Sequence, residues 1–179
     1  MNVTSKHIEE LLQALGKSEY AYLYLEPMLL YGVGIGLLAY LFALLTGEKR
    51  MQSFSLVIVA ISALMIGPYL GHRSAAQTRI VGIYQASHPE RAEGFVNGTE
   101  IRRNQRWVYY ATAGLAILTL LLGLGRSGAG FTCGGAVIVA GIFAVLVSSL
   151  AHYQESSVYH PNLKTEAKPT LRPTSGGLH

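Results

Sequence analysis

Four long apolar segments, separated by polar stretches, dominate the hydrophobic pattern of the chain. Charged residues are almost absent inside these segments, which cover about residues 27–46, 53–71, 107–125 and 130–151. Each is close to the roughly 20 residues that a helix needs to cross about 30 Å of hydrocarbon. Because a backbone in lipid must satisfy its own hydrogen bonds, such segments are expected to be helical. The pattern therefore predicts an all-α integral membrane four-helix bundle over residues 26–152.

The two ends of the chain are predicted to be accessory to this bundle. Residues 1–25 begin with a capped amphipathic pattern, so we expect a short N-terminal interfacial helix that ends near Gly16. Residues 153–179 form a polar C-terminal tail that contains several prolines. Such a tail buries little apolar surface, and we expect it to be ordered only by a partner.

The polar stretch between the second and third apolar segments is predicted to be a loop over residues 72–106. Arg73–Gln85 can continue the second helix out of the membrane, and His88–Pro89 then breaks it. Asn97–Gly98 favours a tight turn. Pro68 is expected to kink the second span near its end.

Basic residues predict the orientation of the bundle. The two short connections, 47–52 and 126–129, carry only Lys49, Arg50 and Arg126, whereas all other Lys and Arg residues fall on the side of the termini and the middle loop. The positive-inside rule therefore places both termini in the cytoplasm, for a protein of the bacterial cytoplasmic membrane.

The composition narrows the classes of function. The chain is 50% hydrophobic and only 13% charged, and its formal charge of +4 comes from scattered residues, so nucleic acid is not an expected partner. It contains no Asp, and no P-loop, nucleophile elbow or zinc motif. We expect no metal site and no catalysis by the chain alone, although it can belong to an enzyme complex. A small transporter or membrane enzyme, the third interpretation, would need a polar cavity that the apolar segments do not encode.

Rows of small residues predict where the helices pack. Small side chains four residues apart let a neighbouring backbone approach closely. The rows are Gly32 and Gly36 in the first segment, Ala63, Gly67 and Gly71 in the second, and Ala136, Ala140, Ala144 and Ser148 in the fourth. Bundle packing is the main interpretation, and a groove for a flat cofactor or a lipid tail is the alternative.

Two histidines are candidate cofactor ligands. His72 and His152 end the second and fourth apolar segments at about the same depth. Two imidazoles from facing helices form the axial ligand pair of a b-type haem. Both positions also suit ordinary histidines at the water boundary, so the sequence leaves haem b as an alternative.

Glu26–Pro27 marks the start of the first apolar segment. Proline is favourable in the first turn of a helix, and an acid before it is stabilised by the helix dipole. An ionisable group at the membrane surface can instead relay protons or hold a quinol hydroxyl. Both interpretations remain open at this stage.

Three short motifs resemble an uncharacterised family of bacterial four-helix membrane domains. They are Glu26–Tyr31, Leu44–Arg50 and Val158–His160. That family typically has His-Pro-x-Leu-x-His at its first span, a basic-His start to its third and a Val-Tyr-x-His-Gly ending. It sometimes occurs alongside Rieske or cytochrome-type proteins. The resemblance covers about residues 26–162 and implies a four-span fold in a redox complex.

The chain departs from the family at the positions where histidines would stand. Glu26 and Tyr31 replace histidines, Asn104 occupies the third-span position, and Pro161 replaces the terminal glycine. Only His160 can be carried over from the family pattern. A cofactor held by the family histidines is therefore not implied here.

Together these observations predict a non-catalytic membrane subunit. It would pack within and stabilise a larger membrane complex, of a respiratory or photosynthetic electron-transfer kind. Its expected partners are other membrane-protein subunits and the lipid bilayer. The alternative is a haem-b electron-transfer subunit that uses His72 and His152.

Overall fold

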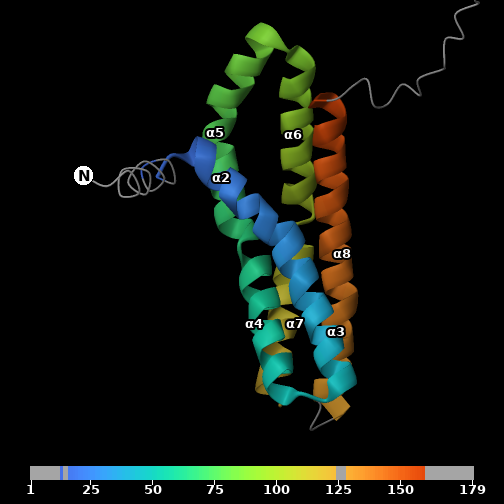
Figure 1. The fold of residues 1–179 in the computed structure, drawn as a ribbon. Coiled ribbons are helices and arrows are strands. Elements are labelled where there is room, and N and C mark those ends of the chain that lie inside the picture. Colours follow the sequence, from blue (N-terminus) through green and yellow to red (C-terminus); the bar gives the residue numbers. More distant parts are fainter. Residues whose placement is uncertain (1–12, 14–15, 124–127, 160–179) are drawn as a thin grey trace, which may run out of the picture.

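Every element in the described part of the chain is a helix, and the polypeptide runs along the bundle in four columns (Figure 1). The computed structural model describes residue 13, residues 16–123 and residues 128–159. The columns consist of α2 (Ser18–Pro27), the π-helix η1 (Met28–Gly32) and α3 (Val33–Thr46); α4 (Lys49–Leu64) and α5 (Ile66–Ser87); α6 (Pro89–Asn104) and α7 (Arg106–Leu121); and α8 (Gly128–Tyr159). The predicted helix before Gly16, and the tail from His160 onward, lie outside the described residues.

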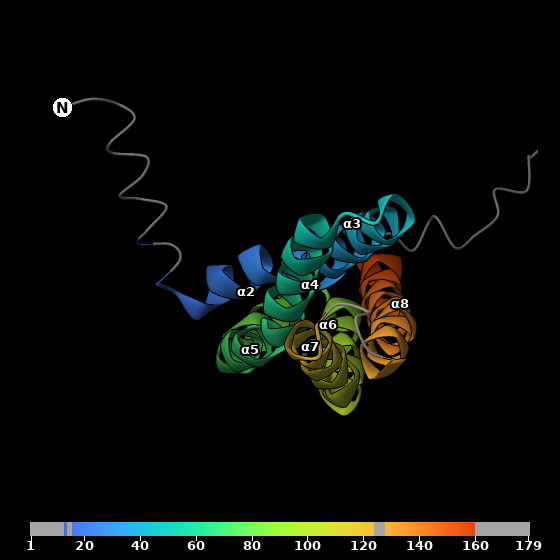
Figure 2. The ribbon, with the colours of Figure 1, turned by 90° about the horizontal axis from the view of Figure 1, so that it is seen from below.

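The bundle has two halves along its length. The apolar half consists of α3, α4, α7 and residues 128–148, which pack on one another; the polar half consists of α2, α5, α6 and residues 149–159. The apolar half lies below and the polar half above in Figure 1. Figure 2 shows that α2 leaves the lower bundle at an angle, and there it packs on α5. Interruptions at η1, Met65 and Gln105 separate the halves in three columns, whereas α8 runs through both.

Apolar side chains cover much of the outside of the apolar half. Exposed examples come from each column, and include Ile35, Leu38, Phe42, Phe54, Ile61, Phe131, Val139, Ile142 and Phe143. Among the described residues, three helical segments are long and apolar enough to cross a membrane, namely Ser18–Thr46, Lys49–Ser87 and Gly128–Ser156. The third predicted segment is shorter than expected. Its helix α7 has 16 residues and ends at Leu121, because Gly123 adopts a left-handed φ of 86°.

Glycines bring three helices of the apolar half into close contact. A Cβ at Gly36 of α3 would lie 2.7 Å from Cγ2 of Val59 in α4, and one at Gly141 of α8 would lie 2.6 Å from Cδ1 of Leu37 in α3. Both distances are shorter than real Cβ contacts. The α3–α4 and α3–α8 contacts therefore depend on the missing side chains.

Some residues of the predicted small-residue rows pack against another helix, and others do not. Gly32 packs on Ser62, Gly36 on Val59 and Gly67 near Tyr110, and Ala63 is fully buried, whereas Gly71 has open space around it. In α8, Ala144 and Ser148 are buried but Ala136 and Ala140 are only partly buried. The glycine face of α8 at Gly134 and Gly141, which the predicted rows did not include, meets α3 instead.

The segment predicted as a polar loop is helical. Residues 72–87 continue α5 and residues 89–104 form α6, and only His88 interrupts the helical hairpin. The turn predicted at Asn97–Gly98 is wrong, because both residues lie inside α6. Gly98 is required there for another reason: a Cβ would overlap the carboxylate of Glu155 in α8.

Both prolines near the junction of the halves lie close to an irregularity in their helical column. Pro27 falls at the end of α2 rather than in the first turn of a span, and the π-helix η1 follows it directly. The second column is interrupted at Met65, three residues before Pro68. Proline has no N–H for the bond to the preceding turn and its ring crowds that turn, which accounts for the interruption at Met65 before Pro68.

Candidate functional site

Two fully buried arginines form the centre of the polar half. Arg73 of α5 and Arg102 of α6 are each 1% exposed. Glu155 of α8 and Glu26 of α2 provide the opposite charges. We call these four residues the charge cluster. One member comes from each column, so the cluster ties all four columns together.

All three guanidinium nitrogens of Arg73 donate hydrogen bonds. Its Nε donates to the Thr99 hydroxyl at 2.7 Å, and its Nη1 donates to the Tyr69 hydroxyl at 2.7 Å. Nη2 donates to the Phe95 carbonyl at 3.1 Å and forms the ion pair with Glu155. The guanidinium carbon lies 4.1 Å from the centre of the Phe95 ring. Such stacking and charge-assisted bonding offset the cost of burying the charge.

Arg102 joins the two carboxylates. Its Nη1 donates to Oε1 of Glu155 at 3.1 Å, and its Nη2 donates to Oε1 of Glu26 at 2.5 Å. Burial alone would lower the pKa of Arg102, but Tyr69, Glu155 and Glu26 outweigh it and raise the pKa, so the group stays charged. Its buried Nε has no acceptor among the described residues.

The cluster is formally neutral and has little contact with water. Its two positive and two negative side chains balance, and Glu26 is the most exposed member with 21% of its side chain accessible. A buried pair of this kind adds little net stability compared with apolar residues, but removing one partner costs about 3–5 kcal/mol. We therefore expect the cluster to fix how the columns are placed relative to one another.

Two cavities adjoin the cluster and share Glu26, His152 and Leu23. The Arg102 cavity has a volume of about 140 Å³ and is lined by Leu23, Glu26, Pro27, Leu29, Leu30, Tyr31, Arg102, Ser148 and His152. The Arg73 cavity, about 470 Å³, is lined by Tyr22, Leu23, Glu26, Arg73, Tyr84, Phe95, His152, Glu155 and Ser156. The apolar segments thus end in mostly apolar cavities that contain a few charged and polar side chains, which their composition did not predict.

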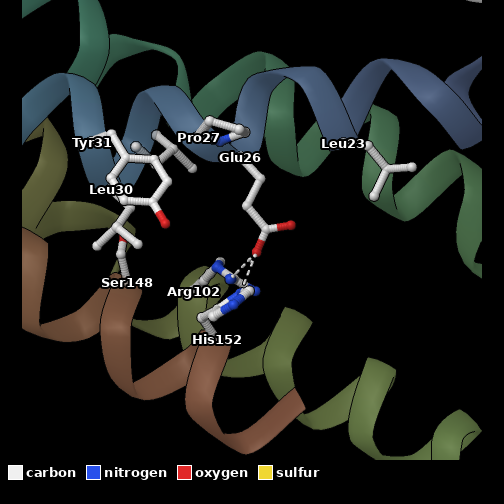
Figure 3. A pocket seen from close by; sticks show the side chains of 9 residues that line it. Leu23, Glu26, Pro27, Leu30, Tyr31, Arg102, Ser148 and His152 are labelled. Carbon is white, nitrogen blue, oxygen red and sulfur yellow. Dashed lines mark hydrogen bonds and ion pairs between the residues drawn. The ribbon is translucent and has the colours of Figure 1, made fainter. Parts of the chain in front are cut away.

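Figure 3 shows the arrangement in the Arg102 cavity. Glu26 points from the first column towards Arg102 and His152, which lie across the cavity. Nδ1 of His152 is 3.6 Å from Oε1 of Glu26. Ser148 also lines the cavity, and its hydroxyl is 2.5 Å from that of Tyr109. Glu26, Arg102 and His152 lie together in the middle of the view, with Leu30, Tyr31 and Ser148 on one side of them and Leu23 on the other.

The two candidate haem ligands have different neighbours. His72 is partly buried, and its Nδ1 lies 3.3 Å from the Ser18 hydroxyl at the start of α2. His152 lines both cavities, and 61% of its side chain is exposed. No described contact or described cavity brings the two imidazoles together. Within residues 16–123 and 128–159, no group of three or more His, Cys, Asp or Glu side chains is placed to hold a metal ion.

Arg73, Arg102 and Glu155 were not predicted as members of a site. Arg73 was expected only at the start of the continued second helix, and Arg102 only as a basic residue of the loop. One signal was present: Ala92, Phe95, Thr99 and Arg102 are spaced three or four residues apart, as on one helical face, and all four are buried. A helical interpretation of residues 89–104 would have placed Arg102 on the inward face.

Comparison with protein-family models, with curated proteins and with solved structures gave no match. The resemblance to bacterial four-helix membrane domains therefore stays a prediction that rests on the short motifs alone.

Proposed function

We propose that the chain spans a membrane four times and acts as a non-catalytic subunit that packs within a larger membrane complex. The electron-transfer kind of complex, which the motif resemblance implies, is part of this proposal. The observation that carries it is an apolar groove between α7 and α8, described below.

The membrane placement is supported by the distribution of exposed side chains. Exposed apolar residues surround the apolar half, where only a hydrocarbon environment would solvate them well. Exposed aromatic residues lie at the junction of the halves, with Tyr31 in η1 and Trp107 directly after the interruption at Gln105. Such rings favour the boundary between lipid and water. The polar half would then project from the bilayer, on the cytoplasmic side by the positive-inside rule.

The short helix α7 is the least obvious of the four spans. With 16 residues it is about 24 Å long, less than the roughly 30 Å of hydrocarbon. It packs on both α4 and α8, which are parts of longer apolar segments. A short span is accommodated by local thinning of the bilayer, at a modest cost.

The groove supports the role of a subunit. It has a volume of about 480 Å³, and its lining is almost wholly apolar: Trp107, Val108, Ala111, Ala136, Val139, Ala140 and Phe143. Ala136 and Ala140 belong to the small-residue row, yet packing inside the chain leaves them partly exposed. In lipid, a row of small residues gains stability when another helix packs closely on it. A transmembrane helix of another subunit is therefore the proposed occupant of the groove.

Substitution in the groove tests this role. Ala140→Phe fills the groove and is expected to abolish stoichiometric co-purification with the partner assembly from native membranes. The control is Ile142→Phe, on the same helix but outside the groove and 50% exposed. Retained co-purification of Ala140→Phe, in the same ratio as the control, would refute the proposed packing role.

A further inference from the structure

We infer that the Arg102 cavity binds the ring-sized head of an uncharged, membrane-soluble molecule that carries hydroxyl or carbonyl oxygens, such as a quinol. The inference rests on the proposed membrane placement for the route of entry. It does not depend on the packing role of the α7–α8 groove.

The size of the cavity selects a small head group. Its volume of about 140 Å³ is close to that of an apolar cavity of about 150 Å³ in another protein, which admits a benzene ring. A whole lipid is far larger than this space. One six-membered ring with its oxygen substituents is the size of group that fits.

The walls of the cavity have two kinds of chemistry. Leu23, Pro27, Leu29 and Leu30 provide apolar surface and Tyr31 an aromatic ring, whereas Glu26, Arg102, Ser148 and His152 are polar. Ligand sites typically combine such apolar walls with a few convergent polar groups. A ring has apolar faces and polar substituents at its edge, so both parts of the wall would be in use.

The charges around the cavity favour an uncharged ligand. Glu26 is neutralised by Arg102, which also pairs with Glu155. An anionic head would have to compete with these two carboxylates for the arginine. A phosphate head group is therefore disfavoured, and hydrogen bonds are left as the means of recognition.

Donors and acceptors for such bonds are present in the cavity wall. Nδ1 of His152 faces Glu26, and an imidazole has a second ring nitrogen that can donate to a carbonyl or accept from a hydroxyl. Glu26 can accept a hydroxyl hydrogen.

The backbone beside the cavity is irregular where the ligand would lie. Pro27 and the π-helix η1 contribute Pro27, Leu29, Leu30 and Tyr31 to the wall. π-helical turns are rare in proteins, and those that occur often lie at functional sites. This turn also lies at the junction between the halves, where a molecule dissolved in lipid would first meet polar groups.

Binding can be measured with the full chain in lipid nanodiscs. The probes are a benzoquinol with a ten-carbon tail and the same ring without a tail, each titrated calorimetrically against loaded and empty discs. We expect saturable binding at one site per chain, at least about tenfold tighter for the tailed probe because its tail partitions into the bilayer. Equal affinity of the two probes would refute the inference that the ligand enters the cavity from the bilayer.

Two substitutions test the location of the site. His152→Ala removes one hydrogen-bond partner and should weaken binding about tenfold without changing the melting temperature, because His152 is largely exposed. Leu30→Trp fills the cavity and should abolish binding. Leu38→Trp, in the same column but 69% exposed in the apolar half, is the control and should bind as the unaltered chain does.

The inference is overturned if the tailed probe binds no more to loaded than to empty discs, or if His152→Ala binds it as tightly as the unaltered chain. It is also overturned if an anionic phospholipid displaces the probe competitively. The packing role is tested separately, by co-purification, and His152→Ala should still co-purify with partner subunits. Recovery of the chain in the soluble fraction without detergent would refute the membrane placement itself.

Discussion

The two halves of the bundle contain the same four columns but are held together by different interactions. In the apolar half, absent side chains at Gly36 and Gly141 let α3 approach α4 and α8. In the polar half, Arg73 and Arg102 are completely buried and bind carboxylates from two other columns. The apolar half thus relies on close approach of backbones, and the polar half on opposite charges.

This difference follows from the solvent proposed for each half. In lipid, apolar side chains gain nothing by leaving the solvent, so association depends on close van der Waals packing. Where water is the solvent, apolar burial drives association but specifies geometry weakly, and a buried charge cluster adds specificity. The junction between the two regimes contains Glu26, His152 and the Arg102 cavity.

The largest expected effect is the loss of a carboxylate from the charge cluster. Glu155→Ala leaves Arg73 and Arg102 with one counter-charge between them, and should lower the free energy of unfolding by about 3–5 kcal/mol. Denaturant unfolding of the purified chain in detergent micelles measures this change. Glu19→Ala is the control. It removes an ion pair with the exposed Arg79, 72% of whose side chain is accessible, and should cost no more than about 1 kcal/mol.

Equal losses for the two variants would mean that the cluster is solvated like a surface pair. The contrast drawn between the halves would then fail, because charge would not be holding the polar half together.

A lysine on the outside of the apolar half tests whether that half lies in lipid. Leu38 is 69% exposed near the middle of the first apolar segment, so Leu38→Lys would be nearly neutral in water. In a bilayer it should raise the apparent free energy of insertion by about 3 kcal/mol. Insertion into microsomes, scored by a glycosylation tag beyond the span, measures the difference.

The matched control for this lysine lies in the polar half. Ile83 of α5 is 60% exposed, and Ile83→Lys should leave insertion unchanged if that half projects into water. If the two lysines raise the free energy of insertion by similar amounts, both halves lie in the same solvent. If neither lysine raises it, the apolar half does not lie in a bilayer.

The sequence predicted the helical class of the apolar half because its signal is local: long apolar runs are readable along one helix. The predicted small-residue rows did not include Gly141, whose contact with Leu37 depends on how two distant helices pack. The charge cluster depends on side chains that are distant in sequence, such as Arg73 and Glu155. Neither residue is remarkable in its own segment, and only the packing of α6 on α5 and α8 brings them together.

The incorrect turn at Asn97–Gly98 has the same cause. The dipeptide has a strong local preference for turns, but it lies between Phe95 and Arg102 on a helix whose inward face binds Arg73 and Glu155. Tertiary contacts outweighed the local preference there. The glycine remained necessary, because the carboxylate of Glu155 occupies the place of its side chain.

The smallest of the three expected effects concerns that glycine. Gly98→Ala would place a methyl group against the Glu155 carboxylate and disturb both ion pairs, at an expected cost of about 1–3 kcal/mol by denaturant unfolding in micelles. Gly82→Ala is the control in the same half. Nothing lies within 4 Å of its missing Cβ, so the better helix propensity of alanine should stabilise the chain by about 0.5–1 kcal/mol.

The Glu155→Ala background shows whether the cost of Gly98→Ala comes from the cluster. All three of the nearest atoms that a Cβ at Gly98 would meet belong to the Glu155 side chain beyond its Cβ. Once that side chain is truncated, Gly98→Ala should no longer destabilise the chain, and the two substitutions should be non-additive by the whole cost of the overlap. Additive losses would mean that Gly98 is needed for the α6 backbone itself. In that case, close approach of backbones would hold the polar half together as it does the apolar half.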